Sequence, residues 1–119
     1  MMNSYLALLM GAIIGSSLRY LFYLNQFNFL GIPLSTTFVN ILGSSLAGFF
    51  LNKVEGQFYI FLYVGLFGSF TTLSAFNVEI FNLISDQSLI KALIYFVLNI
   101  FTSFIFFYIF YILGLKIAY

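Results

Sequence analysis

The chain has 119 residues, of which 63% are hydrophobic and only 6% are charged. A soluble domain of this length needs far more charged surface, so the composition predicts an integral membrane protein. The sequence contains no cysteine and no histidine, which excludes disulfides, Cys/His zinc sites and thiol nucleophiles. Its formal net charge of +1 provides no basic patch, so we expect no nucleic-acid partner.

Four apolar segments, taken in chain order, are each long enough to cross the ~30 Å hydrocarbon core of a bilayer as a helix. They cover residues 4–24, 33–51, 57–84 and 89–113. Short polar connectors separate them, and Pro33 is expected to open the second helix. Membrane-spanning β-strands would be shorter and alternating. The sequence therefore predicts an all-α integral membrane protein with a single four-helix domain over residues 1–119.

The positive charges of the connectors do not favour one orientation in the membrane. Four crossings place Lys53 and Lys116 on one side and Arg19 and Lys91 on the other. Two interpretations stay open. Either weak preferences fix one orientation, or the chain inserts both ways and pairs with an inverted copy of itself or of a relative.

Small residues recur at helical spacing in the first two segments. Gly11 and Gly15 in the first, and Gly43 and Gly48 in the second, allow close approach of helix backbones. For the glycines of the first segment, packing within one subunit is as good an explanation as contact between subunits. Asn40, deep in the second segment, predicts a hydrogen bond between helices or contact with something polar. Because four helices enclose little interior, we expect an oligomer.

The third segment is too long for one straight crossing. Residues 57–84 would extend about 42 Å as a continuous α-helix. Within them, the glycines and hydroxyl side chains of GLFGSFTTLSAF (65–76) weaken the helix. We predict a break there, which a membrane protein tolerates only where the backbone is buried in protein or lines a cavity. Such a break can bind a cation or an anion; a kink without a ligand is the alternative.

Polar and aromatic side chains form a stripe on each of the last two segments. The stripes consist of Thr72, Phe76 and Glu79 on the third segment, and of Tyr95, Asn99 and Ser103 on the fourth. Two such faces predict a hydrated path between helices. Neither stripe contains Lys or Arg, so an anion on the path would contact hydroxyls, amides and ring edges. Two simpler interpretations stay open. Glu79 lies at the membrane interface and not on the path, and Arg19 only extends its charged group toward the interface.

Three motifs in this order resemble the Fluc/CrcB family of fluoride channels, over nearly the whole chain. They are GAIIGSSLRY at 11–20, STTFVNILGSS at 35–45 and GLFGSFTTLSAFNVE at 65–79. The resemblance implies a four-helix subunit with a broken third helix, in an antiparallel, dual-topology-like dimer with two pores. It also implies a location in the cell (plasma) membrane and passive export of cytoplasmic fluoride.

The resemblance further implies which residues form the sites. A structural sodium ion at the dimer centre would be bound by the backbone carbonyls of Gly68 and Thr71, and Arg19 would lie in the pore vestibule. The residues implied along the ion pathway are Asn40, Ser74, Phe76, Glu79, Tyr95 and Ser103.

One departure from the family pattern affects the pathway. The family usually has TTFSTF, with both phenylalanines along the ion path, whereas this chain has TTLSAF, so that Leu73 replaces the first and Phe76 is kept. Each pore of the family combines phenylalanines from both subunits. Two hypotheses stay open: a heterodimer with a related subunit that supplies the missing phenylalanine, or a homodimer that tolerates leucine.

Two other functions compete with a fluoride channel. A small multidrug-type exporter couples protons through an acidic residue in its first span, which this chain lacks, and Glu79 would be an unusual replacement. A non-transporting membrane subunit explains the small-residue stripes but not the broken third segment. The sequence contains no nucleophile–base pair and no metal-ligand cluster, so we expect no enzymatic activity. The sequence therefore favours a fluoride channel.

Overall fold

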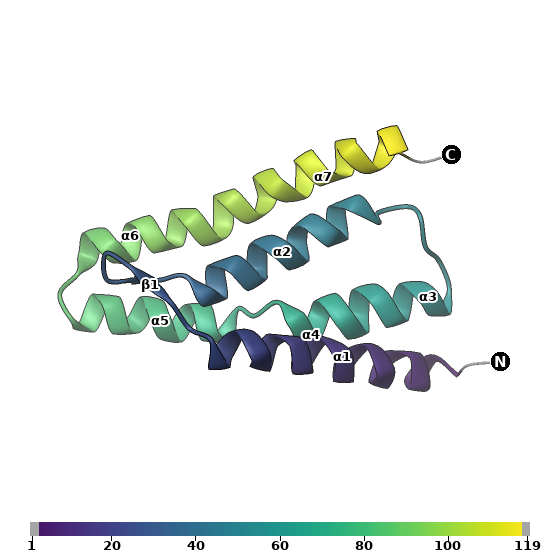
Figure 1. Ribbon diagram of the computed structural model, residues 1–119, viewed down its shortest axis with the longest axis horizontal. Helices are drawn as coiled ribbons and strands as arrows, with labels where there is room; N and C mark the ends of the chain where they lie inside the picture. Colours follow the sequence, from purple (N-terminus) through teal and green to yellow (C-terminus); the bar gives the residue numbers. More distant parts are fainter. Residues whose placement is uncertain (1–2, 118–119) are drawn as a thin grey trace.

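The computed structural model describes residues 3–117, so the first two and last two residues of the predicted domain 1–119 lie outside it. Four helical rods run along the long axis of a flat molecule that measures 52 × 31 × 19 Å (Figure 1). Both ends of the described chain and the connector after the second rod lie at one end of this axis. The other two connectors lie at the opposite end.

The first two rods are single helices, and the last two are assembled from several helical pieces. The first rod is α1 (Ser4–Leu24) and the second is α2 (Ser35–Phe49). The third comprises α3 (Gln57–Tyr59), the π-helical η1 (Ile60–Phe67), α4 (Gly68–Phe70) and α5 (Ser74–Ser85). The fourth comprises α6 (Leu89–Val97), the π-helical η2 (Leu98–Thr102) and α7 (Ser103–Ile117).

A β-hairpin connects the first two rods, and it corrects one expectation. Strands β1 (Asn28–Phe29) and β2 (Ile32–Pro33) pair antiparallel, with Asn28 opposite Pro33. The turn residues Leu30 and Gly31 have φ angles of 53° and 81°, the left-handed conformation that two-residue hairpin turns require. The expectation that Pro33 opens the second helix is therefore wrong, because this proline ends a strand.

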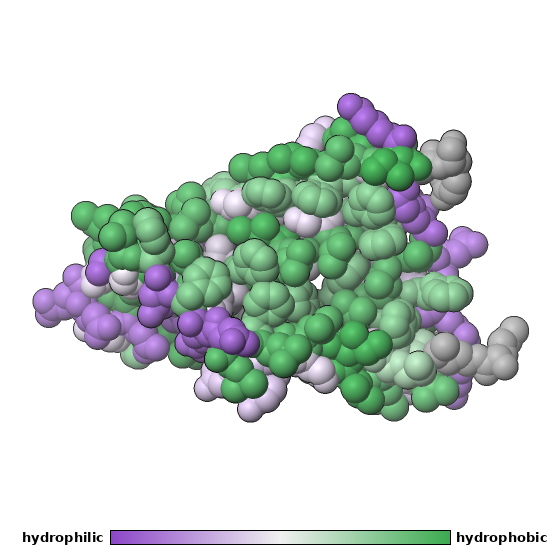
Figure 2. Space-filling view, in the orientation of Figure 1, coloured by the Kyte–Doolittle hydropathy of each residue, from purple (hydrophilic) through white to green (hydrophobic). Residues whose placement is uncertain are grey.

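Three of the rods are long and apolar enough to cross a membrane: Ser4–Leu24, Gln57–Ser85 and Leu89–Ile117. Figure 2 shows a broad hydrophobic band with hydrophilic residues gathered toward the two ends. This is the surface of a multi-pass membrane protein. Helix α2 has 15 residues, or about 22 Å, because strand β2 and the turn after Phe49 take up the ends of the predicted segment 33–51. A fourth crossing stays a prediction.

Glycines allow the rods to pack backbone to backbone within the chain. A Cβ atom at Gly15 of α1 would overlap the carbonyl oxygen of Leu66 in η1. One at Gly48 of α2 would overlap the carbonyl oxygen of Phe107 in α7. Neither position has room for any side chain, so the small-residue stripes are used inside the subunit.

The predicted break in the third rod is confirmed. Between α4 and α5 the chain leaves the helix at Thr71, whose φ and ψ angles are −78° and 157°, and the next helix begins at Ser74. The interruption lies inside the glycine- and hydroxyl-rich stretch 65–76. It positions the candidate site.

Candidate functional site

Asn40 of α2 binds both backbone groups of Thr72 in the break. The Thr72 amide donates to Asn40 Oδ1 at 2.8 Å, and Asn40 Nδ2 donates to the Thr72 carbonyl at 3.1 Å. In a continuous α-helix the Thr72 amide would instead donate to the carbonyl of Gly68. The asparagine side chain therefore takes the place of a helical hydrogen bond, and the Gly68 carbonyl loses its helical donor.

A second backbone amide donates to a side chain in place of its helical carbonyl where α5 begins. The amide of Ala75 donates to Thr72 Oγ1 at 3.1 Å, in the manner of a helix N-cap, and this hydroxyl lies 3.2 Å from Ser74 Oγ. In a continuous helix the Ala75 amide would donate to the carbonyl of Thr71. The carbonyls of Gly68 and Thr71 thus both lose their helical donors. Carbonyl oxygens freed in this way at membrane depth suit a cation.

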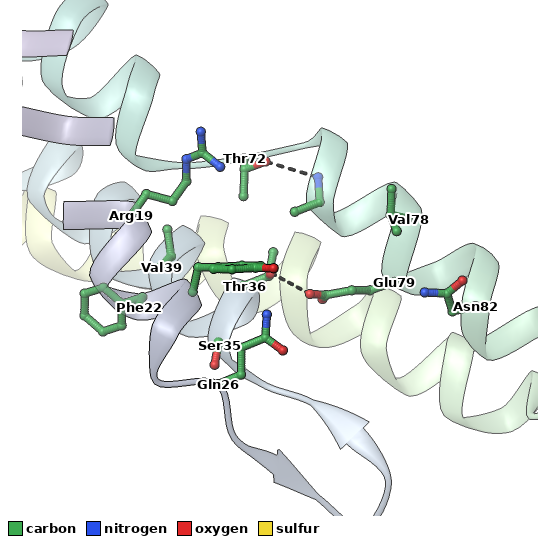
Figure 3. Close-up of a pocket in the computed structure, with 12 residues that line it drawn as sticks. Arg19, Phe22, Gln26, Ser35, Thr36, Val39, Thr72, Val78, Glu79 and Asn82 are labelled. Atoms are coloured by element: carbon green, nitrogen blue, oxygen red, sulfur yellow. Dashed lines mark hydrogen bonds between the residues drawn. The ribbon is translucent and has the colours of Figure 1, made fainter. Parts of the chain in front are cut away.

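Arg19 of α1 is attached to the same break. Its Nε donates to the carbonyl of Ser69 at 3.0 Å, and the side chain is half-buried. Arg19 also lines a cavity of about 390 Å³, where Figure 3 shows it on the opposite side from Glu79 of α5. The predicted vestibule residue is therefore both a cavity wall and a hydrogen-bond donor to the broken helix.

Glu79 has two hydroxyl partners in this cavity. Thr36 of α2 donates to Glu79 Oε1 at 2.8 Å, and the fully buried Tyr95 of α6 donates to Oε2. The Tyr95 ring stacks on that of Phe76, with centroids 5.5 Å apart. A carboxylate at membrane depth is costly unless it has such partners. Three residues predicted along the pathway thus form one contiguous cluster.

A second hollow, of about 240 Å³, also borders the break. Its lining comprises Asn40, Ser44, Thr71, Thr72, Leu73, Phe76, Asn99, Ile100 and Ser103. The hydroxyl oxygen of Ser103 is buried and has no hydrogen-bond partner within residues 3–117. Thr72 lines both hollows, so both border the break. A polar, uncharged groove with an unpartnered hydroxyl suits a small hydrogen-bond acceptor.

The structure gathers the predicted pathway residues around the break. Asn40, Phe76 and Ser103 line the second hollow, Glu79 lines the first, and Tyr95 joins Glu79 to Phe76. Ser74 is exposed and contacts the Thr72 hydroxyl.

The sequence interpretation missed Thr36, which donates to Glu79. Its position four residues before Asn40 places both on one face of α2, and this spacing could have identified it.

Comparison with known proteins identifies the family of the chain. Residues 6–114 match the family model described as "CrcB-like protein, Camphor Resistance (CrcB)". The chain is 33% identical over 112 residues to the fluoride-specific ion channel FluC of Sulfurihydrogenibium sp. (strain YO3AOP1), covering 87% of this chain and 90% of that protein. It is 41% identical over 101 residues to the fluoride-specific ion channel FluC of Thermus thermophilus, covering 79% and 81%. The chain therefore belongs to the CrcB family.

Proposed function

We propose that this protein is a fluoride-selective channel of the plasma membrane, through which cytoplasmic fluoride leaves the cell passively. The observation that carries the proposal is the break at Thr72, which Asn40 binds and which borders two hollows with hydroxyl and amide side chains in their linings. Tyr95 connects these hollows, because it contacts Glu79 in the first and Phe76 in the second. The relatives named fluoride-specific ion channels support the choice of ion.

The chemistry of the hollows suits fluoride. This small anion holds water strongly, so a pore must offer many donors without trapping the ion. The hydroxyl of Ser103 and the ring of Phe76 line the second hollow and supply weak positive partners, and no lysine or arginine lines it within the described residues. The amino-terminal end of the 12-residue helix α5 adds a partial positive charge at the break.

The carbonyls of Gly68 and Thr71 support a structural sodium ion. The residues that would donate to them in a continuous helix donate to side chains instead. Hard cations take roughly six or more oxygen ligands. One chain offers two carbonyls here, so we propose that a second, inverted subunit contributes the equivalent pair, which gives four protein oxygens and leaves the remaining ligand positions to water. Sodium would then lie at the centre of an antiparallel dimer of four-helix subunits.

The second subunit is either another copy of this chain or a relative with a phenylalanine at the position of Leu73. The Leu73 side chain lines the second hollow and is 66% exposed, so a partner subunit has access to it. Fluoride efflux measured with this chain alone distinguishes the homodimer from the heterodimer.

The test of the proposed function is fluoride efflux from liposomes that contain only the purified chain, with chloride as the control anion. Efflux of fluoride without chloride supports the channel and a working homodimer. If the chain alone gives no fluoride efflux but co-expression with a TTFSTF relative does, the result supports the heterodimer. No fluoride efflux from either preparation would contradict the proposed function.

Replacing Phe76 with isoleucine is expected to reduce fluoride efflux by about tenfold or more. The substitution removes the aromatic ring that lines the second hollow and its stack on Tyr95, a contact of about 1 kcal/mol. Phe81→Ile is the matched control, because Phe81 is on the same helix and is 67% exposed. Equal efflux from the two variants would remove Phe76 from the pathway.

Removing sodium is expected to abolish fluoride efflux and to weaken the dimer. The reason is that the Gly68 and Thr71 carbonyls would face one another without a cation. Efflux and oligomeric state are compared in sodium and in N-methylglucamine, an organic cation too large for a carbonyl cage. Identical behaviour in the two cations would show that these carbonyls hold no sodium.

A further inference from the structure

Asn99, on the π-helical turn η2, uses both ends of its side-chain amide. Its Nδ2 donates to Thr37 Oγ1 at 2.7 Å and to the carbonyl of Tyr95 at 3.3 Å. Its Oδ1 accepts from Asn40 Nδ2 at 3.0 Å. The residue is only 3% exposed, so no lipid or solvent group replaces these partners. Asn99 therefore links the fourth rod to the asparagine that binds the break.

The direction of this hydrogen-bond chain is fixed at both ends by the backbone. The Tyr95 carbonyl can only accept, and the Thr72 amide can only donate. Between them the order is Tyr95 carbonyl, Asn99 amide, Asn40 amide, Thr72 amide. If the Asn99 amide were reversed, its oxygen would face the Tyr95 carbonyl and its NH₂ group would face that of Asn40. Asn99 thus adds a third hydrogen bond that holds the Asn40 amide in the orientation its two bonds to Thr72 require.

The local backbone is unusual at this point. Leu98–Thr102 form a π-helical turn between the α-helices α6 and α7, and such turns are rare and often occur at functional sites. This turn bears the only fourth-rod side chain, within the described residues, that hydrogen-bonds to Asn40. The π-helical turn and the hydrogen-bond chain are independent features, and both centre on Asn99.

We propose that Asn99 is a positioning residue for the broken helix. By holding the Asn40 side chain in place against Thr72, it keeps the Thr72 amide away from the Gly68 carbonyl, so that the break holds one conformation. Asn99 acts through Asn40. The consequence for ion conduction rests on the proposed function, whereas the effect on the conformation of the break does not.

The test uses a spin label at the break. The chain contains no cysteine, so Leu73→Cys creates a single labelling site on an exposed residue of the break. The mobility of the label is measured by electron paramagnetic resonance in liposomes, with and without Asn99→Leu. The ratio of mobile to immobile label is expected to rise about tenfold, the change that loss of one buried hydrogen bond produces in an equilibrium. Asn77→Leu, an exposed asparagine on α5, is the control.

A second variant and a double variant complete the test. Asn99→Ser is smaller and keeps a hydroxyl that cannot reach both Tyr95 and Asn40, so it is expected to raise mobility even where Asn99→Leu does not fold. Adding either variant to Asn40→Leu is expected to cause no increase beyond that of Asn40→Leu alone, because Asn99 acts through Asn40. A spectrum unchanged by Asn99→Ser, or independent additive effects of the two positions, would overturn the proposal. Since the label is read without fluoride, a failure of fluoride efflux would not change this outcome.

Discussion

The pair of hydrogen bonds between Asn40 and Thr72 is the constraint on which the rest of the site depends. In a hydrocarbon environment each backbone amide and carbonyl must have a partner inside the protein, so a transmembrane helix breaks only where another group replaces its own bonds. Asn40 supplies both replacements. Diverting the Thr72 amide releases the Gly68 carbonyl, and Arg19 satisfies the neighbouring Ser69 carbonyl.

The break organises the polar groups that the proposed function requires. It ends one helix and starts α5, whose Phe76 lines the second hollow and whose Glu79 lines the first. Thr36 and Tyr95 bind the Glu79 carboxylate, so its charge is dispersed before an anion approaches. Fluoride conduction, as proposed, would follow from the uncharged groups that line the second hollow near the break.

The sequence predicted features that depend on local chemistry. The first rod at residues 4–24 and the break within 65–76 follow from hydropathy and from clustered glycines and hydroxyls. It did not predict the bond from Arg19 to Ser69 or that from Thr36 to Glu79, because these partners are 50 and 43 residues apart. Pro33 was misassigned, since a proline suits the end of a strand as well as the start of a helix.

The proposed meeting of two inverted subunits at their broken helices is tested most directly by a distance between spin labels. One label per subunit is placed at Leu73→Cys or at Glu55→Cys in the dimer that conducts fluoride. Inverted subunits predict roughly 20–25 Å between Leu73 labels, about two helix diameters. They predict a separation comparable to the 52 Å long axis between Glu55 labels, which lie at opposite ends of inverted subunits. Equally short distances at both positions would mean parallel subunits and would contradict this arrangement.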